Sequence, residues 1–149
     1  MNVRILVDTN VLLRAIRRDD LLCRVARDSL RRLRRLGYTL CVTPQNVKEF
    51  WNVCTRPTDN NGLGLSIAAA ERQTRFLKRC FSILADSELT YQEWRRLVPA
   101  AEVRGKQVHD AYLVAAMKAH GIARILTFNT QDFNRYKDEN IEPVHPTLA

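Results

Sequence analysis

The 149-residue sequence lacks the features that mark several large classes of protein. No apolar run approaches the roughly 20 residues that cross a bilayer, and the N-terminus carries no charged segment with an apolar core and cleavage site. The four cysteines form no C-x-x-C pair and have no nearby histidines at the spacing of a zinc site. We therefore expect a cytoplasmic protein with reduced cysteines and no membrane partner.

Glycine and proline are also scarce, with five of each, and no segment is repeated. Together with an ordinary apolar share of 46%, this composition argues against disordered, collagen-like and solenoid proteins. A chain of this length can bury a substantial core of its own. We expect one domain that spans residues 1–149.

Positive charge is in excess, with 24 Lys and Arg against 16 Asp and Glu, and the formal net charge is +8. The excess favours a polyanionic partner, most of all nucleic acid. Nine arginines lie between Arg14 and Arg35, several of them on one side of an amphipathic helix that is expected to end near Gly37. This arginine stripe has three interpretations: contact with nucleic-acid phosphates, a solvated face, or contact with a protein partner.

Apolar segments alternate with helical patterns along the chain. Val3–Val7 is typical of a strand buried on both faces, and further strands are expected at residues 38–43, 81–84, 122–128 and 141–144. Besides the amphipathic helix, helices are expected after residue 10, from Pro44, after Ser66, after Thr90 and over residues 108–120. Thr90 and Glu93 have the spacing of a capping box, and Phe76 is a candidate core residue. The alternation predicts a parallel sheet with helices on both faces.

Four acidic residues lie where solubility alone does not explain them. Asp8 follows the first strand, Asp110 opens an apolar stretch, Glu49 lies between hydrophobic neighbours, and Asp132 comes shortly after the fourth expected strand. A charge near apolar groups is costly unless it is paired or bound to a metal. Carboxylates suit Mg²⁺ and Mn²⁺, and these cations promote the hydrolysis of phosphodiesters. The four acids together predict a metal-dependent, phosphodiester-cleaving site.

Each acid taken alone also has a structural interpretation. Asp8 and Asp110 are suitable helix caps, and Asp132 could cap a helix that begins before Phe133. Glu49 could be an ordinary solvated helix residue. His109 has a pKa range that suits acid–base chemistry, but a local hydrogen bond at the start of a helix is the simpler role.

The segments that carry these acids resemble those of the PIN-domain ribonucleases, in particular the VapC-like toxins of toxin–antitoxin pairs. The resemblance covers essentially the whole chain, in the order of the family. It rests on Asp8-Thr9-Asn10-Val11-Leu12, on Glu49 in the helix after Pro44, on His109-Asp110-Ala111, and on Thr127-Phe128-Asn129-Thr130-Gln131-Asp132-Phe133.

The resemblance implies an α/β fold, a three-layer α/β/α sandwich with a central, mostly parallel sheet. It also implies that Mg²⁺ or Mn²⁺ binds among the predicted catalytic acids, which are Asp8, Glu49, Asp110 and Asp132. Some relatives carry an aspartate at the position of Asn129, so Asp132 is a direct ligand, a ligand through water, or a neighbour. The side chains expected to orient the acids are those of Asn10, Thr127 and Asn129. Arg104 and Lys106, which precede Asp110, are candidates for holding the substrate backbone.

By the same resemblance, the expected function is metal-dependent endoribonuclease activity in the toxin of a toxin–antitoxin pair. The expected partners are an RNA substrate, a cognate antitoxin and a second copy of the chain. One alternative is a non-catalytic RNA-binding or protein-interaction module with the same fold. Another is phosphoryl transfer on an aspartate, which is disfavoured because Asp8-Thr9-Asn10 replaces the Asp-x-Asp of phosphatases that use this chemistry.

Overall fold

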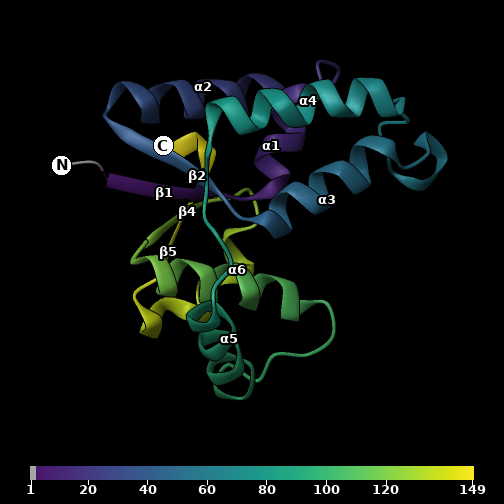
Figure 1. Ribbon diagram of the computed structural model, residues 1–149. Coiled ribbons are helices and arrows are strands. Elements are labelled where there is room, and N and C mark those ends of the chain that lie inside the picture. Colours follow the sequence, from purple (N-terminus) through teal and green to yellow (C-terminus); the bar gives the residue numbers. More distant parts are fainter. Residues whose placement is uncertain (1–2) are drawn as a thin grey trace.

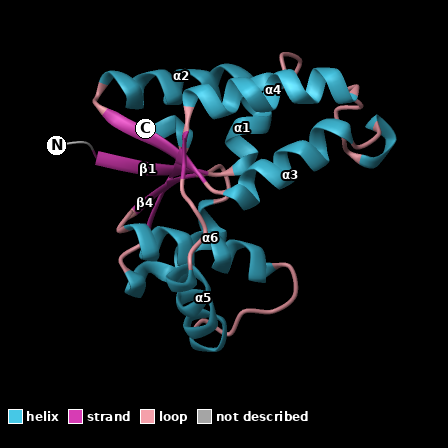
Figure 2. Ribbon diagram, in the orientation of Figure 1, coloured by secondary structure: helices cyan, strands magenta, loops and turns pink. Residues whose placement is uncertain are grey.

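The structure is a computed structural model that describes residues 3–149. A five-stranded sheet forms its middle layer, with the strand order β3-β2-β1-β4-β5 and every adjacent pair parallel. Figure 2 shows the strands as a layer between helices. The strands are β1 (Val3–Val7), β2 (Tyr38–Val42), β3 (Ser82–Ile83), β4 (Arg124–Leu126) and β5 (Glu142–Val144).

Helices cover both faces of the sheet (Figure 1). One face carries α1 (Thr9–Ile16), α2 (Cys23–Arg35), α3 (Pro44–Thr55) and α4 (Ile67–Cys80). The other carries α5 (Glu88–Ala100), α6 (Gln107–His120) and the 3-10 helix η2 (Thr130–Glu139). Two short 3-10 turns, η1 (Thr58–Asn60) and η3 (Pro146–Leu148), complete the chain. The expected three-layer α/β/α architecture is confirmed, and β5 lies at the sheet edge as expected.

The apolar strands are explained by burial on both faces of the sheet. In β1, Ile5 and Val7 pack toward α1 to α4, whereas Leu6 packs toward α5 and α6, and all three are at most 1% exposed. A strand with a helix layer on each side needs apolar residues at consecutive positions. This arrangement fixes the carboxyl end of β1, and therefore the place of Asp8.

The start of α3 is fixed by its own sequence. Thr43 accepts a hydrogen bond from the backbone N–H of Asn46, whose side-chain oxygen accepts one from the backbone N–H of Thr43. Pro44 occupies the first turn, where no backbone donor is needed. Because the helix begins at a defined residue, the side that Glu49 occupies is defined as well.

Two expectations about the helices are wrong. Ser87, not Thr90, caps α5, so the helix begins at Glu88 and runs through Pro99 to Ala100. Thr90 lies inside the first turn, where its backbone N–H donates to the Ser87 hydroxyl. Phe76 is 61% exposed rather than buried, because α4 turns this residue toward a groove beside α2.

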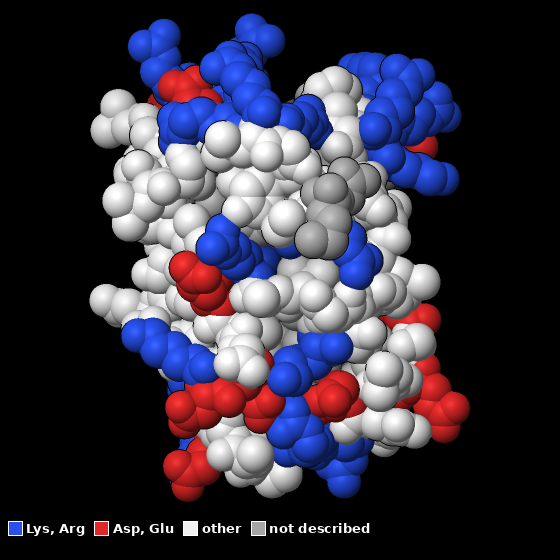
Figure 3. Space-filling model, turned by 90° about the vertical axis from the view of Figure 1, so that its left-hand side faces the viewer, with Lys and Arg blue, Asp and Glu red and all other residues white. Residues whose placement is uncertain are grey.

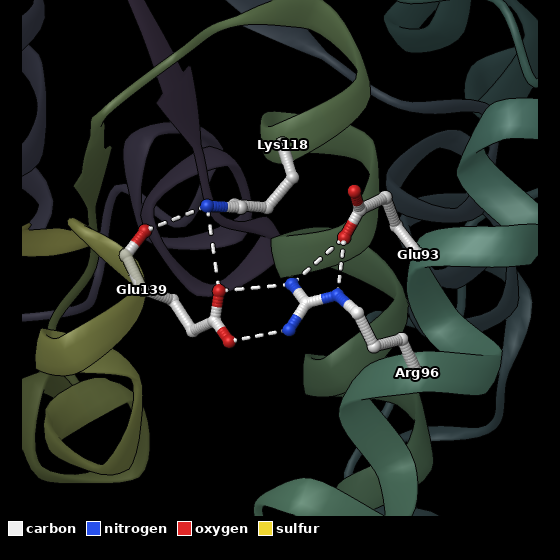
Figure 4. Close-up of polar contacts among 4 residues, drawn as sticks. All are labelled: Glu93, Arg96, Lys118 and Glu139. Carbon is white, nitrogen blue, oxygen red and sulfur yellow. Dashed lines mark hydrogen bonds and ion pairs between the residues drawn. The ribbon is translucent and has the colours of Figure 1, made fainter.

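An ion-pair cluster joins α5, α6 and η2 (Figure 4). The guanidinium of Arg96 contacts both carboxylate oxygens of Glu139, at 2.7 and 2.9 Å, and also donates to Glu93. The Nζ of Lys118 lies 3.3 Å from the same Glu139 carboxylate. These contacts, above all the one from Arg96, lower the pKa of Glu139 to about 2. We call the four residues the Glu139 cluster.

The described residues include no helix with the length and apolar character needed to span a membrane. The four cysteines are free, and three of them, Cys23, Cys41 and Cys54, are buried. Burial raises the pKa of the Cys54 thiol to about 11, which disfavours the reactive thiolate.

Candidate active site

The four predicted acids lie together at the carboxyl edge of the sheet. They line one cleft of about 340 Å³, with α3 on one side of it and α6 on the other (Figure 1). In parallel α/β sheets this edge is the usual place for a ligand. The lining residues are Asp8, Thr9, Asn10, Leu13, Glu49, Asn52, Val53, Arg56, Asp110, Asn129 and Asp132.

Asp8 is the most enclosed of the acids, with 8% of its surface exposed. It caps α1, because its Oδ1 accepts a hydrogen bond of 2.7 Å from the backbone N–H of Thr9. Its Oδ2 accepts one of 2.8 Å from the hydroxyl of Thr127. Capping and site formation are therefore both roles of this residue, so the structural interpretation of Asp8 does not compete with the functional one.

Asn10, Thr127 and Asn129 connect the ends of β1 and β4 around Asp8. The side chain of Asn10 lies within hydrogen-bond distance of both Asp8 and Thr127, at 3.4 and 3.3 Å. Its oxygen accepts from the backbone N–H of Phe128, and the hydroxyl of Thr127 accepts from that of Asn129. These contacts hold the Asp8 carboxylate in one orientation.

Glu49 is positioned from the opposite side of the cleft by α1 and α3. Its Oε2 accepts a hydrogen bond of 3.0 Å from the hydroxyl of Thr9, which in turn accepts one of 2.9 Å from Asn46. The amide of Gln45 lies 3.5 Å from Glu49 Oε1 and donates to the backbone carbonyl of His109 at 2.9 Å. Gln45 thereby links the helix of Glu49 to the helix of Asp110.

The site disfavours negative charge. Burial raises the pKa of Asp8 to about 6, despite the opposing hydrogen bonds from Thr127 and Thr9. Burial together with the nearby charges of Asp8, Asp132 and Glu49 raises the pKa of Asp110 to about 7, which Arg135 opposes. The four acids form no ion pair with a basic side chain within residues 3–149. A bound cation would relieve both the burial and the repulsion.

The donor set suits a hard divalent cation. All four acids present oxygen, which Mg²⁺ and Mn²⁺ prefer, and the cleft is open enough for water. Within the described chain, however, no three His, Cys, Asp or Glu side chains stand close enough to hold a metal ion together. Mg²⁺ in proteins is usually bound by one or two carboxylates and several waters, so this spacing fits a partly hydrated ion.

Arg104 and Lys106 are not among the residues that line the cleft. Both are exposed, and they lie at the connection that leads into α6. Their contact with substrate stays a prediction. His109 is exposed as well; its backbone carbonyl accepts from Gln45, and its backbone N–H donates to the carbonyl of Lys106.

Sequence reasoning missed Asn52 and Arg56, which line the cleft from α3. Their positions follow Glu49 by three and seven residues, the spacing of neighbours on one helix face. Helical periodicity counted from Glu49 would have found them.

The arginine stripe of α2 lies away from the acids. None of its arginines lines the acidic cleft, and several bind backbone carbonyls: Arg27 donates to Ala15 at 2.6 Å, and Arg34 to Cys80 at 2.7 Å. Figure 3 shows blue side chains gathered along the top of the molecule, where α2 and α4 lie. Part of the stripe therefore joins α2 to its neighbours.

The family of the chain follows from its sequence and is consistent with this site. The family model for the PIN domain matches residues 5–139. The chain belongs to the PIN domain family. This match confirms the resemblance that the acidic segments indicated, and it includes all four acids of the cleft. None of the curated proteins matches the sequence.

Solved structures share the PIN fold at low sequence identity. The VapBC2 complex from Rickettsia felis, bound to a DNA fragment from its promoter, contains a chain with a TM-score of 0.71 and 13% identity, over 96% of this chain and 98% of that one. A toxin–antitoxin complex from Klebsiella pneumoniae gives 0.65 and 20%, over 95% and 97%. The Mycobacterium tuberculosis toxin VapC20, described as cleaving the sarcin–ricin loop, gives 0.59 and 22%, over 81% and 86%.

Proposed function

We propose that this PIN domain is a Mg²⁺- or Mn²⁺-dependent endoribonuclease and the toxin of a toxin–antitoxin pair. One observation carries the proposal: four carboxylates from four separate segments line one cleft, and no basic side chain within the described residues is ion-paired with them. A non-catalytic module has no use for a buried and a partly buried aspartate whose pKa values are raised to about 6 and 7.

Asp8, Glu49, Asp110 and Asp132 are the residues that would hold the cation, one or two of them directly and the others through its waters. When bound, the cation supplies a reactive water and neutralises charge that develops on the phosphate. Thr127 and Asn10 hold the Asp8 carboxylate in place, and Thr9 does the same for Glu49. Such supporting contacts fix the orientation of ligand oxygens before the cation arrives.

RNA as the substrate is supported by the net charge of +8 and by the fold shared with VapC20 of Mycobacterium tuberculosis. This activity would be exercised in the cytoplasm, where cellular RNA lies.

The decisive experiment compares Asp110→Asn with Asp138→Asn. Asp138 lies in η2 and is exposed, as Asp132 is, but unlike Asp132 it does not line the cleft. In Mg²⁺ or Mn²⁺, Asp110→Asn should cleave RNA on the order of 100-fold more slowly, because it removes a charged group at the reacting centre. Asp138→Asn should match the wild type. Equal rates for Asp110→Asn and the wild type would reject the proposed site.

The proposed antitoxin binds the groove between α2 and α4, which has a volume of about 370 Å³. Its floor is apolar, with Leu12 and Phe50, and arginines such as Arg27 and Arg31 line it. Together with the exposed ring of Phe76, these groups suit a segment that carries both apolar and acidic side chains. The chain alone should slow growth, and the product of a neighbouring small gene should restore it.

Substitution in the groove tests this surface. Phe76→Ser should weaken binding of that product, whereas Tyr91→Ser, at a similarly exposed aromatic residue on α5, should not. Equal affinities of both variants would place the partner elsewhere. The proposed homodimer is tested by the molar mass in solution, measured by light scattering.

A further inference from the structure

Arg56 is the only Lys or Arg among the cleft-lining residues in the described part of the chain. It follows the last turn of α3, and its backbone N–H still donates to Asn52. Glu49, Asn52, Val53 and Arg56 form one face of this helix and its end, and all four line the cleft. The face thus presents a carboxylate at one end and a guanidinium at the other.

The loop after α3 is built around Arg56. Gly64 donates its backbone N–H to the carbonyl of Arg56 at 2.9 Å, and the side-chain Nη2 of Arg56 donates to the carbonyl of Asn61 at 3.1 Å. Gly62 packs against the same residue so closely that a Cβ there would lie 2.6 Å from the Cβ of Arg56. Only glycine fits this contact. The packing of the loop therefore fixes the position of the Arg56 Cβ, from which the side chain extends.

Most of the guanidinium remains without a partner. Of its five N–H donors, the only contact found within residues 3–149 is the one to Asn61, and Nε is buried with no acceptor. A buried donor without an acceptor destabilises the protein, because it has lost its hydrogen bond to water and gained none. This unpartnered donor belongs to a side chain that lines the wall of the cleft.

Arg56 does not serve to neutralise the acids. It forms no ion pair with them in the described chain, and its charge is not among the causes that set the pKa of Asp8 or Asp110. Seven residues of helix separate it from Glu49, which corresponds to about 10 Å. Arg56 is thus in the same cleft as the acids but beyond their immediate contact.

We propose that Arg56 binds a backbone phosphate of the RNA next to the phosphate that is cleaved. The inference rests on the proposed function, because it assumes that the acids bind the cation at the cleaved bond. The planar guanidinium suits bidentate contact with a phosphate, and the distance from Glu49 assigns it to a flanking one. Arg56 then positions the strand and leaves the chemistry to the acids.

The test uses a fluorescent single-stranded RNA and protein that carries Asp110→Asn, so that the RNA stays intact. In this background we compare Arg56→Gln, Arg56→Lys and, as a control, Arg75→Gln, at an exposed arginine of α4 that pairs with Glu71. Arg56→Gln should weaken binding about tenfold and lower the slope of log Kd against log salt by about 0.7, the value for one phosphate contact on a single strand. Arg56→Lys should bind with intermediate affinity, because it keeps the positive charge but loses the planar guanidinium that makes bidentate contact.

Equal affinity and equal salt slope for Arg56→Gln and Arg75→Gln would overturn the assignment. In otherwise wild-type protein, Arg56→Gln should raise KM more than it lowers kcat, whereas a fall in kcat alone would place Arg56 at the reacting phosphate instead. Failure of the proposed function looks different, because then the wild type neither cleaves nor binds RNA.

A second measurement avoids any effect of substitution on folding. The ¹⁵N–¹H signal of the Arg56 Nε, assigned by its loss in Arg56→Lys, should move when the RNA is added to the Asp110→Asn protein, because the phosphate binds the same guanidinium. An unchanged Nε signal, while backbone signals of the cleft shift, would show that the phosphate lies elsewhere.

Discussion

Carboxylates in two parts of this protein have pKa values that are shifted in opposite directions. In the Glu139 cluster, the carboxylate lies between Arg96 and Lys118, and these contacts lower its pKa to about 2. In the cleft, Asp8 and Asp110 have pKa values raised to about 6 and 7. The chain has 24 basic residues and still pairs none with the cleft acids in the part described.

Under the proposed function, the difference separates structural carboxylates from those of the active site. Glu139 joins three elements, and its charge is compensated within the protein (Figure 4). The cleft acids depend on a proton or an added cation for compensation. The uncompensated carboxylates of the cleft lower the stability of the fold, whereas those of the Glu139 cluster do not. Perturbed pKa values of this kind are common at sites that bind ligands.

The largest expected effect is stabilisation by a divalent cation. At pH 8, Mg²⁺ or Mn²⁺ at about 100 times its Kd should raise the free energy of unfolding by about 2.7 kcal/mol. The matched control is Asp110→Asn, which should respond much less, while Glu139→Gln should respond like the wild type. Thermal unfolding with and without the cation measures this. A cation response that survives in Asp110→Asn would contradict the assignment.

A smaller effect is expected from pH in the absence of metal. Since Asp8 and Asp110 have raised pKa values, the native state binds more protons than the unfolded state between about pH 4 and 7. The free energy of unfolding should therefore fall as pH rises from 5 to 8, on the order of 2 kcal/mol after allowance for partial exposure of Asp110. Denaturant titrations at both pH values measure it. Asp110→Asn should show a weaker dependence, and an opposite slope would rule out the charge repulsion.

The smallest effect concerns the Glu139 cluster. Glu139→Gln should lower the free energy of unfolding at pH 7 by about 1 kcal/mol or less, because the ion pairs are partly exposed. Since the pKa of Glu139 is lowered, its contribution is present above about pH 4.5 and disappears as pH falls toward 2. The difference between wild type and variant should thus vanish in acid. RNA cleavage should not change, and a large loss of activity would show that the cluster influences the cleft.

Much of the fold is predictable from local sequence. The consecutive apolar residues of β1, the capping residues Thr43 and Ser66, and the left-handed Gly121 after α6 each act on neighbouring residues. The start of α5 was missed because Ser87 competes with Thr90 for the same role, and both residues suit it. The exposure of Phe76 depends on how α4 lies against α2, which no local pattern specifies.

The candidate site was partly predictable for the same reason. Asp8 could be placed because it follows a strand, and parallel strands present their carboxyl ends at one edge. The other three acids could be singled out because each lies beside apolar residues, and the resemblance to the PIN family gave all four one shared role. The cleft brings them together. Arg104 and Lys106 were candidates for binding the substrate backbone because they precede Asp110 closely in the sequence. Neither residue lines the cleft. Helical periodicity assigns Arg56 to the same face of α3 as Glu49, but whether that face lines the cleft depends on how α3 packs.

The central place of β1 has a consequence for synthesis. Because β1 lies between β2 and β4, Asp8 acquires its Thr127 contact only after β4 has joined the sheet, and Asp132 comes later still. A ribosome must therefore translate most of this sequence before the cleft exists. If the protein cuts RNA, the growing chain stays harmless to the messenger and the ribosome that produce it.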